Sequence, residues 1–114
     1  MNVMNIDNTA PLFRDNVILD VTVFDVRPSE PIGYLCGAEI MLSEDGTASF
    51  CNGKEEVDRF HIRDLVRINT NINNYDPEHD TEIAVITRKK SFRITFSDGK
   101  KKKAFVELLD RIME

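Results

Sequence analysis

The stretch Ile83-Ala-Val-Ile-Thr-Arg-Lys-Lys-Ser-Phe-Arg-Ile-Thr-Phe96 carries the pattern that decides the fold prediction. On both sides of the basic residues 88–90, apolar side chains recur at every second position. That spacing is typical of half-buried β-strands, because successive side chains of a strand point to opposite faces of a sheet. The stretch therefore predicts two antiparallel strands joined by a short basic turn.

The period changes after Asp98. Apolar residues then recur at the spacing of one helical face, and Asp98 is placed to cap the first turn. The apolar residues are Phe105, Leu108, Leu109 and Ile112. We therefore expect an amphipathic helix over 100–114, of about four turns.

Five more segments upstream alternate in the same way. They cover residues 17–27, 34–42, 48–50, 60–62 and 66–72. Short strands at this spacing, followed by a single helix, predict a mainly β fold of the α+β kind. We expect a small antiparallel barrel or sandwich of about seven strands, with its C-terminal helix capping one end.

Length and composition predict one globular domain. The chain has 114 residues, and its 41% hydrophobic and 31% charged content excludes disordered, coiled-coil and collagen-like chains. Residues 1–16 have no sustained period, so we expect a flexible N-terminal arm followed by a single domain over 17–114. The apolar run 32–38 is far shorter than the ~20 residues of a membrane-spanning helix, and the first residues do not resemble a secretory signal.

Charge is distributed unevenly along the chain. Residues 1–87 hold 6 Lys/Arg and 16 Asp/Glu, a balance of −10, whereas residues 88–114 hold 9 and 4, a balance of +5. Like charges on one surface focus electrostatic potential and favour an anionic partner. We call the candidate binding residues the basic stretch; they are Arg88, Lys89, Lys90, Arg93, Lys100, Lys101, Lys102 and Lys103. The alternatives are neutralisation by neighbouring acidic strands and, for the four lysines, a solvated helix start.

The two cysteines, Cys36 and Cys51, are too few for a disulfide framework. Residues 42–47 predict a hairpin with a three-residue loop, in which Ile40 lies opposite Phe50. That register places the two thiols on opposite faces of the sheet. We therefore expect both cysteines to be free, which fits a cytoplasmic protein.

Two local patterns resemble the PH-like superfamily, particularly small bacterial PH and GRAM-type domains. One is Phe60-His-Ile-Arg-Asp-Leu-Val-Arg-Ile68, and the other is 83–96 leading into Ala104-Phe-Val-Glu-Leu-Leu109. The resemblance covers roughly 17–114, although the chain lacks the tryptophan that eukaryotic PH domains usually carry in the terminal helix. The loop at 25–31 has one cation and two acids, so the resemblance does not imply phosphoinositide binding. It implies a scaffold used mostly for binding.

No residue pattern predicts catalysis or a resident cofactor. The acidic segment 76–82 lacks the glycine of a calcium loop, and neither His61 nor His79 has the spacing of a zinc ligand. A nucleophile pair of Cys51 and His61 needs hydrogen-bond contact and a third orienting group, whereas His61 is expected on the outer surface. We find no glycine-rich phosphate loop or nucleophile elbow. The sequence therefore predicts a non-enzyme, with no metal and no cofactor.

The leading hypothesis is a non-catalytic cytoplasmic protein-interaction module of PH-like fold. Its expected contact surfaces are the sheet edges and the basic stretch, and free edges also allow homo-oligomers. The alternative is a peripheral protein that binds an anionic membrane through residues 88–90 and 100–103. A small hydrolase using His61 or Cys51 is a distant third reading. Specific nucleic-acid binding is not expected from an acidic chain.

Overall fold

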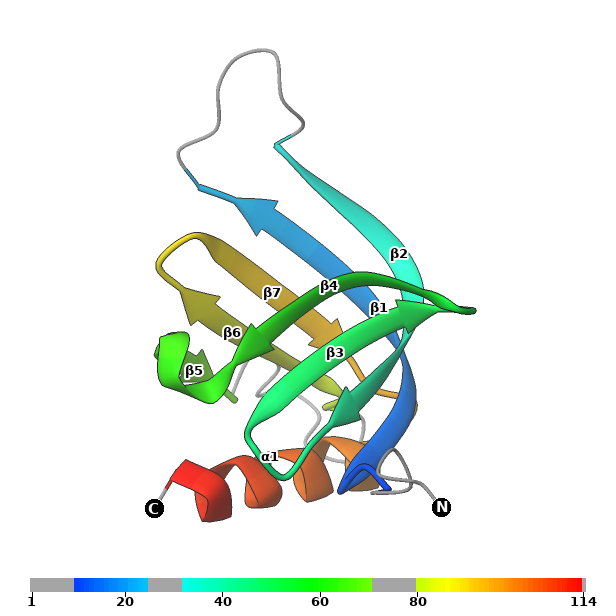
Figure 1. The fold of residues 1–114 in the computed structure, drawn as a ribbon, viewed down its shortest axis with the longest axis vertical. Helices are drawn as coiled ribbons and strands as arrows, with labels where there is room; N and C mark the ends of the chain where they lie inside the picture. The colour runs from blue at the N-terminus through cyan, green and yellow to red at the C-terminus, as the bar shows by residue number, and fades with distance from the viewer. Residues whose placement is uncertain (1–9, 25–31, 71–79, 114) are drawn as a thin grey trace, which may run out of the picture.

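The computed structural model describes residues 10–24, 32–70 and 80–113. Within these ranges seven strands precede one α-helix, as the alternating pattern predicts (Figure 1). The elements are β1 (Phe13–Val23), β2 (Gly33–Leu42), β3 (Thr47–Asn52), β4 (Glu55–His61), the 3₁₀ turn η2 (Ile62–Asp64), β5 (Leu65–Asn69), β6 (Glu82–Thr87), β7 (Lys90–Thr95) and α1 (Gly99–Met113).

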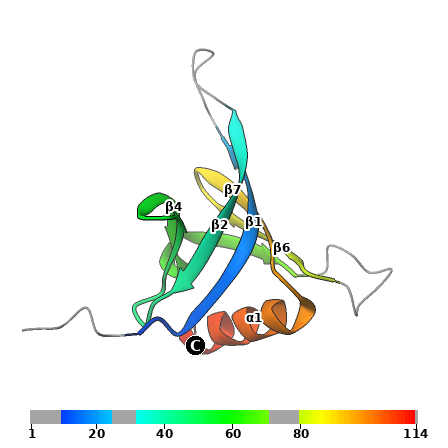
Figure 2. The same cartoon turned by 90° about the vertical axis from the view of Figure 1, so that its right-hand side faces the viewer.

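The strands form one antiparallel sheet in the order β4-β3-β2-β1-β7-β6-β5. The long strand β1 pairs with β2 through residues 13–22 and with β7 through residues 18–23. Because β1 belongs to both halves of the sheet, the sheet curls around it into a half-barrel (Figures 1 and 2). Helix α1 covers one end of this barrel, and we call the other end the mouth. Strands β4 and β5 are the two edges of the sheet.

The β2–β3 hairpin has the predicted register, with Ile40 opposite Phe50. Gly46 in its loop has a φ of 93°, a left-handed conformation that glycine adopts without steric cost. Both Cys36 and Cys51 are free thiols, as expected from this register. The local sequence of the hairpin therefore determines its pairing.

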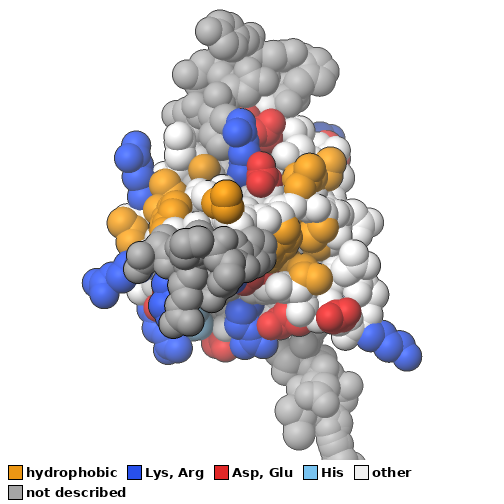
Figure 3. Space-filling model, turned by 90° about the horizontal axis from the view of Figure 1, so that it is seen from above, with side chains coloured by type: hydrophobic (Ala, Val, Ile, Leu, Met, Phe, Trp, Pro, Cys, Tyr) orange, Lys and Arg blue, Asp and Glu red, His pale blue; other side chains and the backbone are white. Residues whose placement is uncertain are grey.

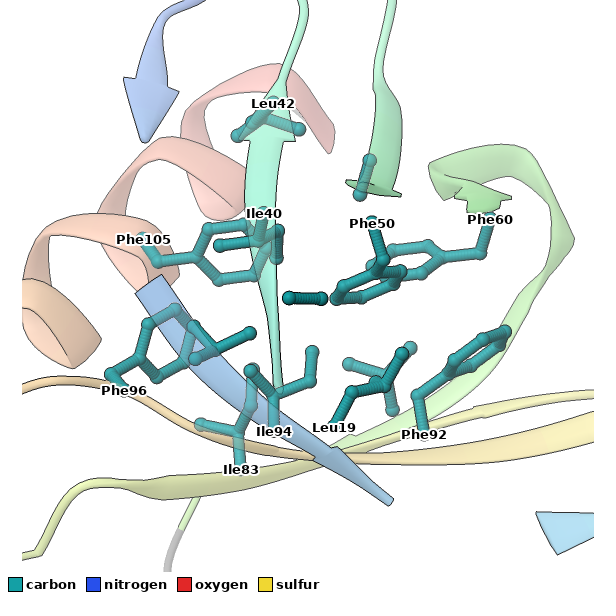
Figure 4. Close-up of a cluster of buried hydrophobic side chains, with 14 of the residues drawn as sticks. Leu19, Ile40, Leu42, Phe50, Phe60, Ile83, Phe92, Ile94, Phe96 and Phe105 are labelled. Atoms are coloured by element: carbon teal, nitrogen blue, oxygen red, sulfur yellow. The ribbon is translucent and has the colours of Figure 1, made fainter. Parts of the chain in front are cut away.

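Aromatic side chains from the two halves of the sheet meet inside the barrel (Figure 4). Phe50 of β3 stacks on Phe92 of β7 with the ring centroids 5.8 Å apart, and Phe60 of β4 lies 5.4 Å from Phe92. All three rings are buried. Since β7 belongs to a different half of the sheet from β3 and β4, these contacts hold the half-barrel closed around its core.

Helix α1 covers the end of the barrel with its apolar face. The Oδ1 atom of Asp98 accepts a hydrogen bond from the Lys101 backbone N–H at 2.8 Å, which confirms the predicted N-cap. Phe105 is fully buried, with its ring centroid 5.2 Å from those of both Phe13 and Phe96. The capping role predicted for this segment is therefore confirmed. Within the described ranges, no helix combines the length and hydrophobicity needed to cross a bilayer.

Strand β1 begins earlier than the sequence pattern indicates. Residues 13–16, which the sequence analysis assigned to the N-terminal arm, belong to the sheet. The strand extends because Phe13 packs beneath α1 and because the carboxylate of Asp15 accepts hydrogen bonds from the backbone N–H and the hydroxyl of Ser97, at 2.8 and 2.7 Å. Residues 1–9 of the predicted arm lie outside the described residues.

Candidate functional site

The basic stretch does not form one surface. Arg88 and Lys89 occupy the β6–β7 turn near the mouth, whereas residues 100–103 open α1 at the other end of the barrel (Figure 1). The two groups lie beyond opposite ends of β6, a strand of six residues that spans about 20 Å. Viewed from the mouth, lysine and arginine side chains lie apart from one another, among acidic and hydrophobic ones (Figure 3). The predicted residues therefore divide between a turn, a strand and a helix start.

Three cations of the basic stretch are bound by carboxylates. The pairs are Lys90 with Asp58 at 2.9 Å, Arg93 with Glu82 at 2.7 Å, and Lys102 with Asp80 at 2.5 Å. For these three, the charge is neutralised by neighbouring acidic residues, the alternative that the sequence analysis left open. The remaining five make no ion pair with a described residue; they are Arg88, Lys89, Lys100, Lys101 and Lys103.

Lys102 is buried at the start of α1, unlike a solvated or ligand-binding lysine. Its ammonium donates to the backbone oxygen of Thr70 at 2.7 Å and to the Asp80 carboxylate at 2.5 Å. Thr70 follows β5 and Asp80 precedes β6, so one ammonium ties the helix to the ends of two strands. Only 8% of Lys102 is exposed, and an external anion does not reach it in this arrangement.

A pocket of about 740 Å³ opens where the end of β4, η2 and the start of β5 face the β6–β7 turn. We call it the corner pocket. The buried rings of Phe60 and Phe92 contribute its apolar floor, with Leu65 and Val66 beside them. Its cationic lining residues are Arg59, Arg63, Arg88, Lys89 and Lys90, and its acidic one is Asp64. The pocket is therefore lined by apolar and charged side chains together, and we call its five cations the rim cations.

Two of the five rim cations form ion pairs, Lys90 with Asp58 and Arg59 with Glu56. Arg59 forms a bidentate pair with Glu56, at 2.6 and 2.9 Å, and its hydrogen bonds lower the pKa of that carboxyl. Arg63, Arg88 and Lys89 are exposed and have no carboxylate partner among the described residues. Three exposed cations without a carboxylate partner in the described ranges therefore line the corner pocket.

Arg63 is positioned by the short turn η2. The ring Nδ1 of His61 accepts a hydrogen bond from the Arg63 backbone N–H at 3.1 Å, and the Ile62 N–H donates to the Gly46 oxygen at 3.0 Å. A Cβ atom at Gly46 would lie 2.7 Å from the Ile62 side chain, so the hairpin and η2 fit closely. His61 is therefore a half-buried cap of this turn, and not the simple surface residue that the alternation predicts.

Arg88 and Lys89 are held by the side chain of Thr87. Its hydroxyl accepts hydrogen bonds from the backbone N–H groups of Lys89 and Lys90, at 3.3 and 3.1 Å, and donates to the Lys90 oxygen at 3.0 Å. A threonine that bonds its own turn in this way fixes the backbone locally. The turn therefore presents its two basic side chains from a defined backbone.

Above the core, a polar cluster that we call the mouth latch joins three strands. The hydroxyl of Tyr34 on β2 donates to Asp58 of β4 at 2.6 Å. The ammonium of Lys90 on β7 donates to both oxygens of the same carboxylate, at 3.0 and 2.9 Å. The Asp58 side chain is only 7% exposed, so these bonds are shielded from water. The mouth latch fixes one wall of the corner pocket through Lys90.

The mouth latch predicts an unusual titration for Tyr34. Burial, the hydrogen bond to Asp58 and the negative charge of Asp58 all raise the pKa of the phenol above its ordinary value of about 10. Because the folded state holds this proton more tightly, the contribution to stability is complete below pH ~10 and declines as the pH rises further. In a Tyr75→Phe variant, which leaves one tyrosine, the absorbance change of phenolate formation is expected well above pH ~10. A midpoint near the ordinary value in the folded protein contradicts the mouth latch, and adding Asp58→Asn should lower the midpoint.

Cys51 and His61, the two residues that the hydrolase hypothesis requires in contact, lie far apart. In the β3–β4 register His61 lies opposite Thr47, whereas Cys51 lies opposite Glu56, four residues further along β3 and about 13 Å away. Across the described ranges, no cluster of three or more His, Cys, Asp and Glu side chains is placed to hold a metal ion. What the geometry offers chemically is anion binding beside an apolar floor.

Sequence reasoning missed Arg59 and Arg63 as site residues. They lie outside the basic stretch, and they reach the β6–β7 turn only because the sheet curls. The available signal was the break between the alternating segments 60–62 and 66–72, where the structure has η2.

No protein-family profile and no curated protein sequence matches this chain. Among solved structures, it is similar to the activated truncation of Vav1 (TM-score 0.63, 9% identity, covering 96% of this chain and 28% of that one). The tandem PX-PH domains of Bem3 from Saccharomyces cerevisiae give a TM-score of 0.61 at 12% identity, over 94% of this chain and 43% of that one. The fold is PH-like.

A C-terminal domain from Leishmania infantum also matches, with a TM-score of 0.61 and 12% identity over 96% of this chain and 89% of that one. The chain spans less than half the length of the Vav1 and Bem3 structures. At such identities the likeness concerns the fold alone. It confirms the PH-like resemblance seen in the sequence and leaves the ligand to be argued from the site.

Proposed function

We propose that this chain is a non-catalytic, cytoplasmic protein-interaction module that binds an acidic segment of a partner at the corner pocket. The observation that supports this is the set of three cations, Arg63, Arg88 and Lys89, which surround the apolar floor without carboxylate partners among the described residues. Both free cysteines fit a reducing compartment.

The chemistry of the corner pocket favours a protein segment over a small anion. Guanidinium groups such as those of Arg63 and Arg88 bind carboxylates through paired, charge-assisted hydrogen bonds. The floor formed with Phe60 and Phe92 rewards burial of an apolar side chain, which a free anion lacks. A segment with acidic and apolar residues together satisfies both parts of the site.

The net charge of the whole protein also favours recognition of an acidic partner at a local group of cations. The net charge is −5, so the remaining surface repels a negatively charged partner on average. The cations of the rim then determine where such a partner docks, and they speed its association.

A second candidate function is binding to an anionic membrane. Phe24 and Ile32 flank the mouth with 40% and 70% of their surface exposed, and the Phe24 N–H donates to the Lys89 oxygen at 2.9 Å. Apolar side chains beside cations are typical of a surface that inserts among lipid headgroups. In this second candidate function the mouth and the β6–β7 turn contact the membrane, and residues 100–103 are not required.

Charge reversal distinguishes the corner pocket from the helix start. The double variant Arg88→Glu/Lys89→Glu should reduce capture of an acidic partner from a lysate of the source organism by at least about tenfold, since each reversal replaces attraction by repulsion. The matched control is Lys100→Glu/Lys103→Glu, which changes the net charge by the same four units on exposed residues that make no ion pair with any described residue. Quantitative mass spectrometry of the bound proteins provides the readout. Equal losses in both variants, or none in either, would contradict the proposal.

Vesicle sedimentation separates the two candidate functions. If the protein binds peptides or proteins but not vesicles of mixed neutral and anionic lipid, the interaction module is supported. Salt-sensitive binding to anionic vesicles that disappears in Arg88→Glu/Lys89→Glu, together with no captured partner, would favour the membrane instead.

A further inference from the structure

Lys90 belongs both to the mouth latch and to the lining of the corner pocket. It lies two residues before Phe92 on β7, and both side chains point to the same face of that strand. The side chain of Lys90 is 34% exposed, whereas that of its partner Asp58 is only 7% exposed. The cation of this pair is therefore partly accessible at the corner pocket, and its carboxylate is shielded.

Asp58 keeps a hydrogen-bond donor on each carboxylate oxygen without Lys90. Its Oδ2 atom accepts from the Tyr34 hydroxyl at 2.6 Å, and its Oδ1 atom accepts from the Arg59 backbone N–H at 2.8 Å. A buried carboxylate without donors is costly, whereas one that accepts hydrogen bonds on both oxygens is stabilised in its charged form. The Asp58 carboxylate therefore stays hydrogen-bonded when the Lys90 ammonium leaves it.

The pair of Lys102 with Asp80 is built differently. Both side chains are nearly buried, at 10% and 12% exposed, and the Oδ1 atom of Asp80 has no donor among the described residues. Asp80 depends on the Lys102 ammonium for the hydrogen bond to its other oxygen. Of these two lysine pairs, Lys90 with Asp58 is therefore the one whose cation can be exchanged.

Exchange requires movement of the Lys90 side chain alone. The backbone N–H and oxygen of Lys90 are both bonded to the Thr87 hydroxyl, at 3.1 and 3.0 Å, and these bonds are independent of the ammonium. A lysine carries its charge on a flexible four-carbon stem, so rotation about that stem redirects the ammonium while the strand stays in place.

We propose that a carboxylate of the acidic partner segment takes the Lys90 ammonium from Asp58 when the segment binds in the corner pocket. This inference rests on the proposed function and adds a ligand-binding residue to it. Lys90 becomes a fourth cation for the ligand, beside Arg63, Arg88 and Lys89. Asp58 is an internal competitor, which selects for segments with a carboxylate placed to reach Lys90.

Removal of the competing charge tests the exchange. The probe is a capped peptide in which glutamates flank a leucine on both sides, and the control peptide has glutamine in place of glutamate. Asp58→Asn should tighten binding of the glutamate peptide by at least about fivefold, because the peptide no longer competes for the Lys90 ammonium. The matched control is Glu82→Gln, which raises the net charge equally but releases Arg93, a residue outside the corner pocket. It should change the affinity, measured by isothermal titration calorimetry, less than about twofold.

A nuclear magnetic resonance measurement on the unmodified sequence observes the exchange itself. The scalar coupling across the hydrogen bond from the Lys90 Nζ atom to the Asp58 carboxylate carbon should be lost when the protein is saturated with the glutamate peptide. The corresponding coupling from Lys102 to Asp80 is the internal control and should persist, because that pair is buried at the other end of the barrel. If Asp58→Asn does not fold, this measurement decides alone.

The outcomes separate this inference from the proposed function. If Arg88→Glu/Lys89→Glu abolishes peptide binding while Asp58→Asn behaves like Glu82→Gln, or while the Lys90 coupling persists at saturation, the exchange is wrong and the acidic ligand stands. If the glutamate peptide fails to bind, binds no better than the glutamine peptide, or binds indifferently to the charge reversal, both are overturned.

Discussion

Replacing Lys102 with methionine is expected to lower the free energy of unfolding by about 3–5 kcal/mol, because it leaves the Asp80 carboxylate buried and unpaired. The ammonium of Lys102 is the partner of both Asp80 and the Thr70 oxygen, at 2.5 and 2.7 Å. One oxygen of Asp80 already lacks a hydrogen-bond donor among the residues that the structure describes. Methionine keeps the length of the side chain and a good helix propensity, so the change isolates the ion pair. Urea unfolding followed by circular dichroism measures the effect.

Two further variants determine whether the ion pair explains the loss. Lys103→Met removes the same charge from an exposed neighbouring position and should change stability by no more than about 0.5 kcal/mol. Lys102→Met combined with Asp80→Leu should recover much of the loss, since apolar residues often replace a buried ion pair with little cost. A Lys102→Met variant as stable as Lys103→Met would show that the pair contributes nothing.

Lys102 also shows what the sequence pattern contained and what it lacked. Residues 102, 105 and 109 are spaced three and four apart, so Lys102 shares the helical face of Phe105 and Leu109. That spacing could have identified it as the buried member of the four lysines. Its partner could not be identified, because Asp80 lies more than twenty residues earlier and meets α1 only after the sheet has formed.

Local features were predictable for a physical reason. The Leu42–Thr47 hairpin fixed the register of Ile40 against Phe50 and separated the cysteines, because a turn acts on residues adjacent in sequence. The corner pocket is the opposite case. It joins the end of β4 to the β6–β7 turn, and these meet because β1 pairs in both halves of a curled sheet. A charge count along the chain grouped Lys89 with Lys103, which the fold separates, and omitted Arg63.

Phe105→Ala is the second substitution expected to have a large effect, about 3–5 kcal/mol of unfolding free energy. Its ring is fully buried and contacts the rings of Phe13 and Phe96 at centroid distances of 5.2 Å. Truncation opens a cavity between α1 and the sheet, and neither the helix nor the strands can collapse into it without losing their own contacts. Chemical unfolding at equilibrium measures the cost, with Glu107→Ala as the control on the exposed face of the same helix.

A double-mutant cycle with Phe13→Ala tests whether the helix stabilises the barrel through this cluster. If the three rings form one cluster that closes the barrel end, the two truncations should couple by about 1 kcal/mol or more, since each removes a contact of the other. Additive losses would mean that α1 packs on the sheet without depending on the first residues of β1. A cost below about 1 kcal/mol for Phe105→Ala itself would contradict the capping role, because exposed positions have effects of that size. The early start of β1 at Phe13 and the capping by α1 therefore depend on the same contact.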